Sequence, residues 1–185
     1  MFTISKKIHH SDMKKKYPRT LSSGANNTVI ALSETEVGKI FTGYTRTDIG
    51  SEAEKMQFAN GINGLVVKFI RLDEFGEEEE LLVMERLHPL DFRTFEQEKR
   101  ELILSVFEDE LIQLHKKGFV HRDLRRPSDI PGFAFDNIFL TQTGIRLIDV
   151  GISVLKHQVG ERLFERFIKQ ELAEFEIFRE FFLSR

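Results

Sequence analysis

The chain has 185 residues, 41% of them hydrophobic, which predicts either one domain of ordinary size or two small lobes that share a cleft. Charged residues make up 31% of the sequence, but the formal net charge is only −3, which excludes the strongly basic character of a nucleic-acid-binding protein. The absence of cysteine excludes disulfides, thiolate nucleophiles and metal sites built on cysteine.

Residues 1–18 are basic and polar and predict an N-terminal extension. Their lysines are not followed by an apolar core, so we do not expect a secretory signal. No apolar run in the sequence approaches the length of about 20 residues that spans a bilayer. We therefore expect a cytoplasmic protein that contacts neither a membrane nor nucleic acid.

Residues 19–86 predict a small lobe that is rich in β-structure and contains one helix. β-Branched and apolar residues favour strands at 28–32, 37–41, 65–72 and 81–87. Between the second and third of these strands, apolar residues recur every three positions over 47–62, which predicts the helix.

Residues 87–185 predict a mainly helical lobe. A helix over 95–117 is expected to end at Gly118, and short strands are expected at 137–140 and 145–148. The helix carries an apolar stripe that we expect to be buried, formed by Leu102, Ile103, Val106, Phe107, Leu111 and Leu114.

A last helix is predicted over 160–183, with a phenylalanine-rich face. We expect this face to pack in the core; the alternative is that it binds a partner. Strands, one helix, further strands and then a helical half indicate an α+β fold with two lobes, whose boundary lies near residues 85–89.

Four polar residues at separate places in the chain are candidates for chemistry: Lys39, Asp123, Asn137 and Asp149. Lys39 lies in the second predicted strand, and Asp123 follows the helix that ends at Gly118. Asn137 begins a short apolar strand, and Asp149 ends the next strand just before Val150 and Gly151.

In their order and context these segments resemble the active-site motifs of protein kinases, over about residues 19–155. The stretch Phe119–Leu124 (FVHRDL) resembles the catalytic loop, and Asp149 with the two residues after it resembles the Asp-Phe-Gly signature. The resemblance implies a two-lobed kinase-like fold that uses ATP and Mg²⁺. Asp123 is then the residue that orients the attacking hydroxyl and accepts its proton, and Asn137 and Asp149 bind Mg²⁺.

The resemblance also implies that Lys39 contacts the α- and β-phosphates and is held by a glutamate of the predicted helix. Counting back from residues 65–68, the kinase spacing selects Glu54. Glu52 is the near alternative, on a different face of the helix.

The remaining nucleotide contacts follow from the same resemblance. Residues 21–29 stand where kinases have a glycine-rich phosphate loop, although Gly24 is the only glycine, and residues 81–87 resemble the last strand and hinge beside the adenine. The implied nucleotide-contacting residues are Ser22, Ser23, Gly24, Val29, Met84, Glu85 and Leu87.

The sequence departs from the kinase pattern in two places. The interval from the catalytic Asp to the metal-binding Asn is usually about five residues, whereas here it runs from Asp123 to Asn137, with a loop at 125–134. A competing register brings Ser128 or Asp129 nearer the metal. Residues 152–185 are too few for an activation segment and a full helical lobe, which resembles the atypical RIO-type kinases.

The expected function is that of a minimal Ser/Thr protein kinase, an ATP- and Mg²⁺-dependent phosphotransferase that acts on a hydroxyl. Arg122 favours a protein acceptor, because small-molecule kinases of this group often have glycine there. The alternatives are a small-molecule kinase acting on a sugar or antibiotic hydroxyl, a nucleotide-binding pseudokinase that serves as an interaction module, and a non-catalytic protein whose last helix binds a partner. The sequence identifies neither the acceptor nor the oligomeric state.

Overall fold

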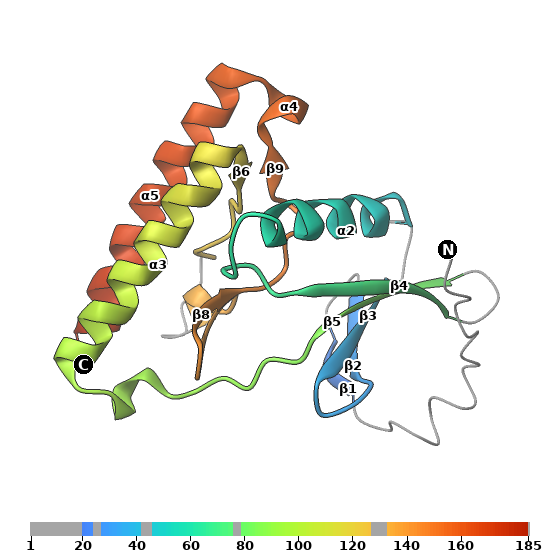
Figure 1. The fold of residues 1–185 in the computed structure, drawn as a ribbon, viewed down its shortest axis with the longest axis horizontal. Helices are drawn as coiled ribbons and strands as arrows, with labels where there is room; N and C mark the ends of the chain where they lie inside the picture. Colours follow the sequence, from blue (N-terminus) through green and yellow to red (C-terminus); the bar gives the residue numbers. More distant parts are fainter. Residues whose placement is uncertain (1–19, 24–26, 42–45, 76–78, 127–132, 185) are drawn as a thin grey trace. The chain divides into compact units, whose positions relative to one another are not determined.

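The fold is mixed α+β, as the sequence predicts (Figure 1). The computed structural model describes residues 20–23, 27–41, 46–75, 79–126 and 133–184. The chain divides into two compact units, which are residues 1–54 with 68–87 (unit 1) and residues 55–67 with 88–185 (unit 2). The predicted extension at 1–18 lies outside the described residues. Within the described part of the chain, no helix is both long enough and apolar enough to cross a membrane.

Unit 1 contains a five-stranded antiparallel sheet with the order β1-β2-β3-β5-β4. Its strands are β1 (Thr20–Ser23), β2 (Asn27–Ala31), β3 (Glu36–Phe41), β4 (Phe69–Phe75) and β5 (Glu79–Glu85). The β2–β3 hairpin turns at Ser33, whose hydroxyl oxygen accepts hydrogen bonds from the backbone N–H groups of Thr35 and Glu36. Such side-chain bonding to a nearby backbone favours a turn over a continued strand.

The predicted strand at 65–72 is wrong in its first part. β4 begins at Phe69, whereas Leu65 and Val67 exchange backbone hydrogen bonds with Leu147 in unit 2. All of residues 65–67 are buried, so their apolar side chains suit this interior position as well as they would suit a strand of the sheet.

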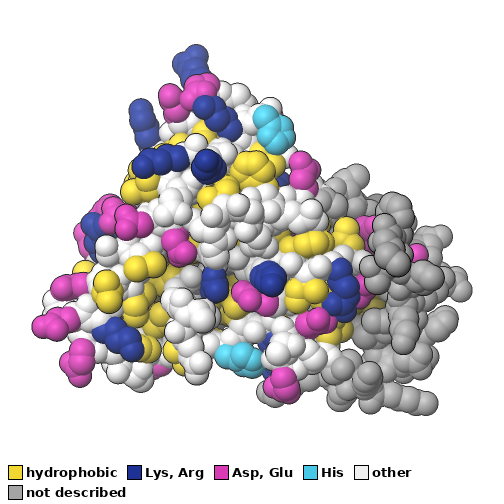
Figure 2. All heavy atoms as spheres, in the orientation of Figure 1, with side chains coloured by type: hydrophobic (Ala, Val, Ile, Leu, Met, Phe, Trp, Pro, Cys, Tyr) yellow, Lys and Arg dark blue, Asp and Glu magenta, His cyan; other side chains and the backbone are white. Residues whose placement is uncertain are grey.

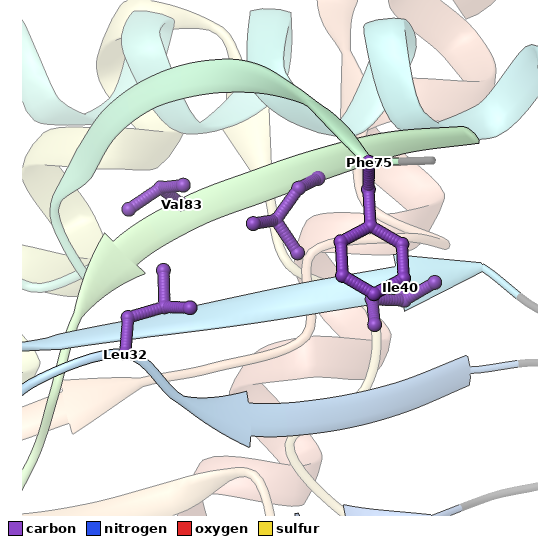
Figure 3. Close-up of a cluster of buried hydrophobic side chains, with 5 residues drawn as sticks. Leu32, Ile40, Phe75 and Val83 are labelled. Atoms are coloured by element: carbon purple, nitrogen blue, oxygen red, sulfur yellow. The ribbon is translucent and has the colours of Figure 1, made fainter. Parts of the chain in front are cut away.

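A cluster of buried hydrophobic side chains packs on the sheet of unit 1 (Figure 3). The cluster consists of Leu32, Ile40, Phe75, Leu81 and Val83. Gly38 lies beside it, and a Cβ atom at this position would come within 2.6 Å of the Leu81 side chain. A side chain at position 38 would therefore force Leu81 to shift, and the close packing of β3 against β5 favours glycine there.

In unit 2, helices α3 (Gln97–Lys117) and α5 (Glu161–Leu183) lie side by side (Figure 1). Phenylalanines fill the space between them: the Phe107 ring packs edge-on against Phe175 and Phe178, with centroids 5.3 and 5.8 Å apart. The apolar face of α5 thus packs in the core, as predicted. α3 ends at Gly118, whose positive φ of 100° suits glycine at a helix C-terminus.

The predicted stripe on α3 is partly wrong. Phe107, Leu111 and Leu114 are buried, but the side chains of Leu102 and Val106 are 66% and 49% exposed. The buried face continues instead through Leu104 and Arg100. Leu102 lies two positions from Leu104, which is about 200° around the helix, so both cannot face the core. The helix also begins at 97 rather than 95, because residues 92–94 form a separate 3₁₀ turn, η1 (Phe92–Thr94).

Two short pairs of antiparallel strands support the loops that carry the candidate residues of unit 2. β6 (Phe119–Val120) pairs with β9 (Val154–Leu155), and β7 (Ile138–Thr141) pairs with β8 (Gly144–Leu147). The other elements of this part of the unit are η2 (Phe133–Phe135) and α4 (Lys156–Val159).

The charged side chains of the described residues are intermixed on the face that Figure 2 shows. Acidic and basic groups lie near one another there rather than in fields of one sign, in keeping with the net charge of −3.

Candidate functional site

Asp123 lies in a loop whose beginning is fixed by a strand pair and by a buried histidine. The loop follows β6, whose Val120 pairs with Val154 of β9. His121 is fully buried, and its Nε2 lies 2.9 Å from the carbonyl oxygen of Ile148, to which it donates a hydrogen bond. This bond ties the loop that carries Asp123 to the chain segment directly before Asp149.

Asn137 contacts Asp123 in spite of the long interval between them. Its Nδ2 donates to the Asp123 backbone oxygen at 2.9 Å and to Asp123 Oδ2 at 2.8 Å. Asn137 is 3% exposed, and its backbone carbonyl oxygen accepts a hydrogen bond from the backbone N–H of Ile148. Since an amide that donates through Nδ2 keeps its oxygen as an acceptor, Asn137 Oδ1 has the orientation that a cation requires of a ligand. Ser128 and Asp129, the competing register, lie outside the described residues.

Asp149 follows β8 in a left-handed backbone conformation, with φ of 59°. Non-glycine residues adopt this conformation rarely, although Asp tolerates it better than most. The segment is held from two sides: Val150 is fully buried, and the buried Lys55 donates from Nζ to the Gly151 carbonyl oxygen at 2.7 Å. Lys55 therefore positions the segment that contains Asp149, a role that the sequence did not indicate.

Arg126 joins the three predicted residues of unit 2. Its Nη2 lies 2.8 Å from Asp123 Oδ2, 3.0 Å from Asp149 Oδ2 and 3.3 Å from Asn137 Oδ1. Its Nε donates to the same oxygen of Asp123 at 3.0 Å, and Nη1 lies 3.4 Å from Asp136 Oδ2. Burial disfavours the charged guanidinium, but the hydrogen bond and charge of Asp123, with those of the other carboxylates, raise its pKa above the ordinary value. Arg126 is a cation at the meeting point of these oxygens.

The donor set fits Mg²⁺ in its chemistry. The carboxylate of Asp149 and the amide oxygen of Asn137 are hard oxygen ligands, the kind that Mg²⁺ prefers. Both contact one nitrogen of Arg126, so they already converge on a single cationic group. Among the described residues, no three His, Asp or Glu side chains gather closely enough to hold a metal, so a site here depends on the amide of Asn137.

Glu171 of α5 holds the loop that carries Asp123 by a hydrogen bond to its backbone. It is 1% exposed; its Oε1 lies 2.9 Å from His115 Nε2, and its Oε2 accepts a hydrogen bond from the backbone N–H of Arg122. Arg122, at a φ of 71°, donates through its side chain to the Ile152 carbonyl oxygen and lies over the Phe167 ring. The sequence analysis did not select Glu171. Its spacing could have indicated it, because it lies seven positions after Phe164 and four before Phe175, on the apolar face of the helix. A charged residue on such a face is expected to be buried with a hydrogen-bond partner.

Glu174 lies one turn further along α5. Burial raises the pKa of its carboxyl, a hydrogen bond from Gln170 works in the opposite direction, and the charge of Glu171 raises it again. The backbone of Arg125 also lowers this pKa. Glu171 therefore supports the loop that carries Asp123 by a hydrogen bond, and Glu174 lies beside it on the same helix.

In unit 1 the lysine on β3 forms a buried ion pair. Lys39 is 4% exposed, and its Nζ lies 2.9 and 3.0 Å from the two carboxylate oxygens of Glu52. Glu52 belongs to α2 (Arg46–Asn60) and is 2% exposed.

The prediction of Glu54 as the partner of Lys39 is therefore wrong, and the alternative, Glu52, is the partner. Glu52 shares the buried face of α2 with Met56 and Ala59. Glu54 is exposed, because two positions along an α-helix correspond to about 200° of rotation.

The predicted nucleotide-contacting residues are described only in part. Gly24 and the side chain of Ser23 lie outside the described residues; Ser22 is exposed and pairs with Val29, which is itself opposite Lys39 in the sheet.

At the predicted hinge, Met84 is buried and Leu87 is half-buried. The N–H of Glu85 donates to the Lys68 carbonyl oxygen at 3.0 Å. The predicted contact of the Glu85 backbone with a base therefore cannot use this N–H group.

Two comparisons of the sequence with known proteins gave no match. No protein-family model matches the chain, and no curated protein is significantly similar to it in sequence.

Proposed function

We propose that this protein is a minimal protein-kinase-like phosphotransferase with two lobes, which binds ATP and Mg²⁺ and transfers the γ-phosphoryl group to a hydroxyl. The observation that carries the proposal is the meeting of Asp123, Asn137 and Asp149, three residues from separate segments. An aspartate that only forms a turn, or an asparagine on the surface, has no reason to lie beside the other two residues. Phosphoryl transfer, in contrast, requires hard oxygen ligands for the metal next to a carboxylate that accepts a proton.

In the proposed reaction Asp123 orients the attacking hydroxyl and accepts its proton. Its Oδ2 takes the hydrogen bonds from Asn137 and Arg126, and among the described residues no bond is made to Oδ1. The bonds to Oδ2 fix the orientation of the carboxylate, and we assign Oδ1 to the acceptor hydroxyl. Asn137 and Asp149 hold Mg²⁺, which, when bound, offsets the negative charge of the phosphates.

Lys39 has the role of the phosphate-binding cation. A buried ammonium on a strand, fixed by both oxygens of Glu52, points in one direction and loses little further freedom when it meets an anion. The acceptor that we favour is a Ser or Thr hydroxyl of a protein, in the cytoplasm, and a sugar or antibiotic hydroxyl is the alternative substrate.

The test is incubation of the purified protein with radiolabelled ATP and Mg²⁺, alone and with a cell lysate. Label on the chain, on another protein or on a small molecule identifies the acceptor class. Asp123→Asn is expected to lower transfer by about 100-fold or more while ATP with Mg²⁺ still raises the melting temperature. Asp149→Ala is expected to abolish that rise. Transfer by Asp123→Asn at the wild-type rate would refute the proposed roles.

A second candidate function is a nucleotide-binding pseudokinase that serves as an interaction module. The position of Arg126 favours it, because the guanidinium engages the same oxygens that a metal would use. ATP binding without transfer to any acceptor, in the presence of saturating Mg²⁺, would support this candidate over the enzyme.

A further inference from the structure

The side chain of Arg126 has no part in the proposed reaction. Its Nη2 donates at once to Asp123, Asn137 and Asp149, one from each of the three segments that form the candidate site. An arginine that contacts one surface carboxylate is ordinary. Arg126 instead contacts both proposed ligands of the divalent cation, so it competes with that cation for them.

The contacts make Arg126 and a metal ion mutually exclusive. Mg²⁺ lies about 2.1 Å from its oxygen ligands, whereas Nη2 lies 3.0 Å from Asp149 Oδ2 and 3.3 Å from Asn137 Oδ1. A metal ion bound to these same two oxygens would therefore lie against a positively charged nitrogen. Both cations cannot use this pair of oxygens at the same time.

The surroundings of Arg126 allow its side chain to withdraw while its backbone stays in place. The backbone N–H of Arg126 donates to the Ala134 carbonyl oxygen at 2.8 Å, which holds the loop. The side chain is 40% exposed, and its Nη1 already approaches Asp136, whose carboxylate is 43% exposed. Asp136 therefore offers the guanidinium a partner outside the group of Asp123, Asn137 and Asp149.

We propose that Arg126 is an internal counter-ion that competes with Mg²⁺ for Asn137 and Asp149, so that metal loading requires the guanidinium to move toward Asp136. This inference rests on the proposed function, since it takes those two residues as the metal ligands. Arg126 then weakens metal binding and keeps the carboxylates compensated when no metal is bound. The site changes from a closed arginine-bridged form to a metal-loaded form.

The test measures Mn²⁺ binding by electron paramagnetic resonance, with Mn²⁺ as the probe for Mg²⁺. The variants are Arg126→Gln, the control Arg125→Gln, and Asp149→Asn alone and combined with Arg126→Gln. Arg125 is the neighbouring exposed arginine, so its change removes the same charge from the same loop. We expect Arg126→Gln to lower the Kd for Mn²⁺ on the order of tenfold, Arg125→Gln to change it less than about twofold, and Asp149→Asn to abolish the gain.

The outcomes separate this inference from the proposed function. If Arg126→Gln and Arg125→Gln change the Kd equally, and Asp149→Asn still removes binding, the metal site stands and the competition is refuted. If Arg126→Gln binds no Mn²⁺, both the competition and the proposed metal ligands are refuted.

A second measurement uses the unaltered chain, in case a variant does not fold. The Nε–H signal of Arg126 in a ¹⁵N spectrum, which reports its bond to Asp123, is expected to move on addition of Mg²⁺, whereas that of Arg93, bonded to Asp91, is expected to stay. An unmoved Arg126 signal at saturating Mg²⁺ would overturn the inference.

Discussion

Glu171→Ala is expected to be strongly destabilising, because this carboxylate is the buried acceptor for two groups at once. It accepts from His115 Nε2 at one oxygen and from the N–H of Arg122 at the other, at 1% exposure. A hydrogen bond to a charged group contributes about 1.5–3 kcal/mol. Loss of both bonds without access of water to the orphaned donors gives about 3–6 kcal/mol, a large part of the roughly 5–15 kcal/mol that stabilises a typical domain.

The assay is equilibrium unfolding in urea, with Glu165→Ala as the matched control. Glu165 is an exposed glutamate on the same helix, so its change should alter the free energy of unfolding by less than about 0.5 kcal/mol. Glu171→Gln keeps one acceptor oxygen and should lose about half as much as the alanine variant. It serves as the test if the alanine variant does not fold.

The backbone amide signal of Arg122 gives a local readout in the same experiment. Its proton resonance is expected to move upfield in Glu171→Gln, because an amide oxygen is a weaker acceptor than a carboxylate. A Glu171→Gln protein as stable as Glu165→Ala, with the Arg122 amide signal unmoved, would refute this account of Glu171.

Three further predictions concern single residues. Glu52→Gln should lower the free energy of unfolding by about 3–5 kcal/mol, because it removes the carboxylate charge that pairs with the buried ammonium of Lys39, whereas the exposed Glu54→Gln should be nearly neutral in the same urea titration. Glu174→Gln should raise the melting temperature at pH 8. The folded-state pKa of Glu174 is above its ordinary value of 4.5, so its contribution to stability is fully present below 4.5 and is lost as the pH rises through the folded pKa; a gain at pH 8 that does not shrink on acidification would contradict this. Gly38→Ala should cost about 1–3 kcal/mol in urea unfolding, since its Cβ would lie 2.6 Å from Leu81, and a neutral effect would show that the sheet yields easily there.

The elements that depend on local sequence could be predicted well. The β2–β3 hairpin, the end of α3 at Gly118 and the phenylalanine face of α5 each follow from residues a few positions apart. The segment 65–67 could not be assigned in this way. A short apolar run fits a strand of the sheet and a position beside Leu147 equally well, and only tertiary contacts decide between them.

The residues of the candidate site were easier to predict than the contacts that these residues make with one another. Asp123 and Asn137 stood out by their motifs, but the choice between Glu52 and Glu54 depended on the rotation of α2, which a count of residues does not give. Arg126 was seen only as part of a loop, since nothing in the sequence reveals that a residue three positions after Asp123 also reaches Asp149.

The aromatic face of α5 fixes the register of the helix as well as its burial. Phe164 and Phe175 lie on either side of Glu171 along the chain and are both buried, so their packing sets the direction in which the carboxylate points. One residue inserted between Phe164 and Glu171 would turn the two apart by about 100°. We therefore expect this stretch to accept exchanges of one apolar side chain for another more readily than any change in the number of residues.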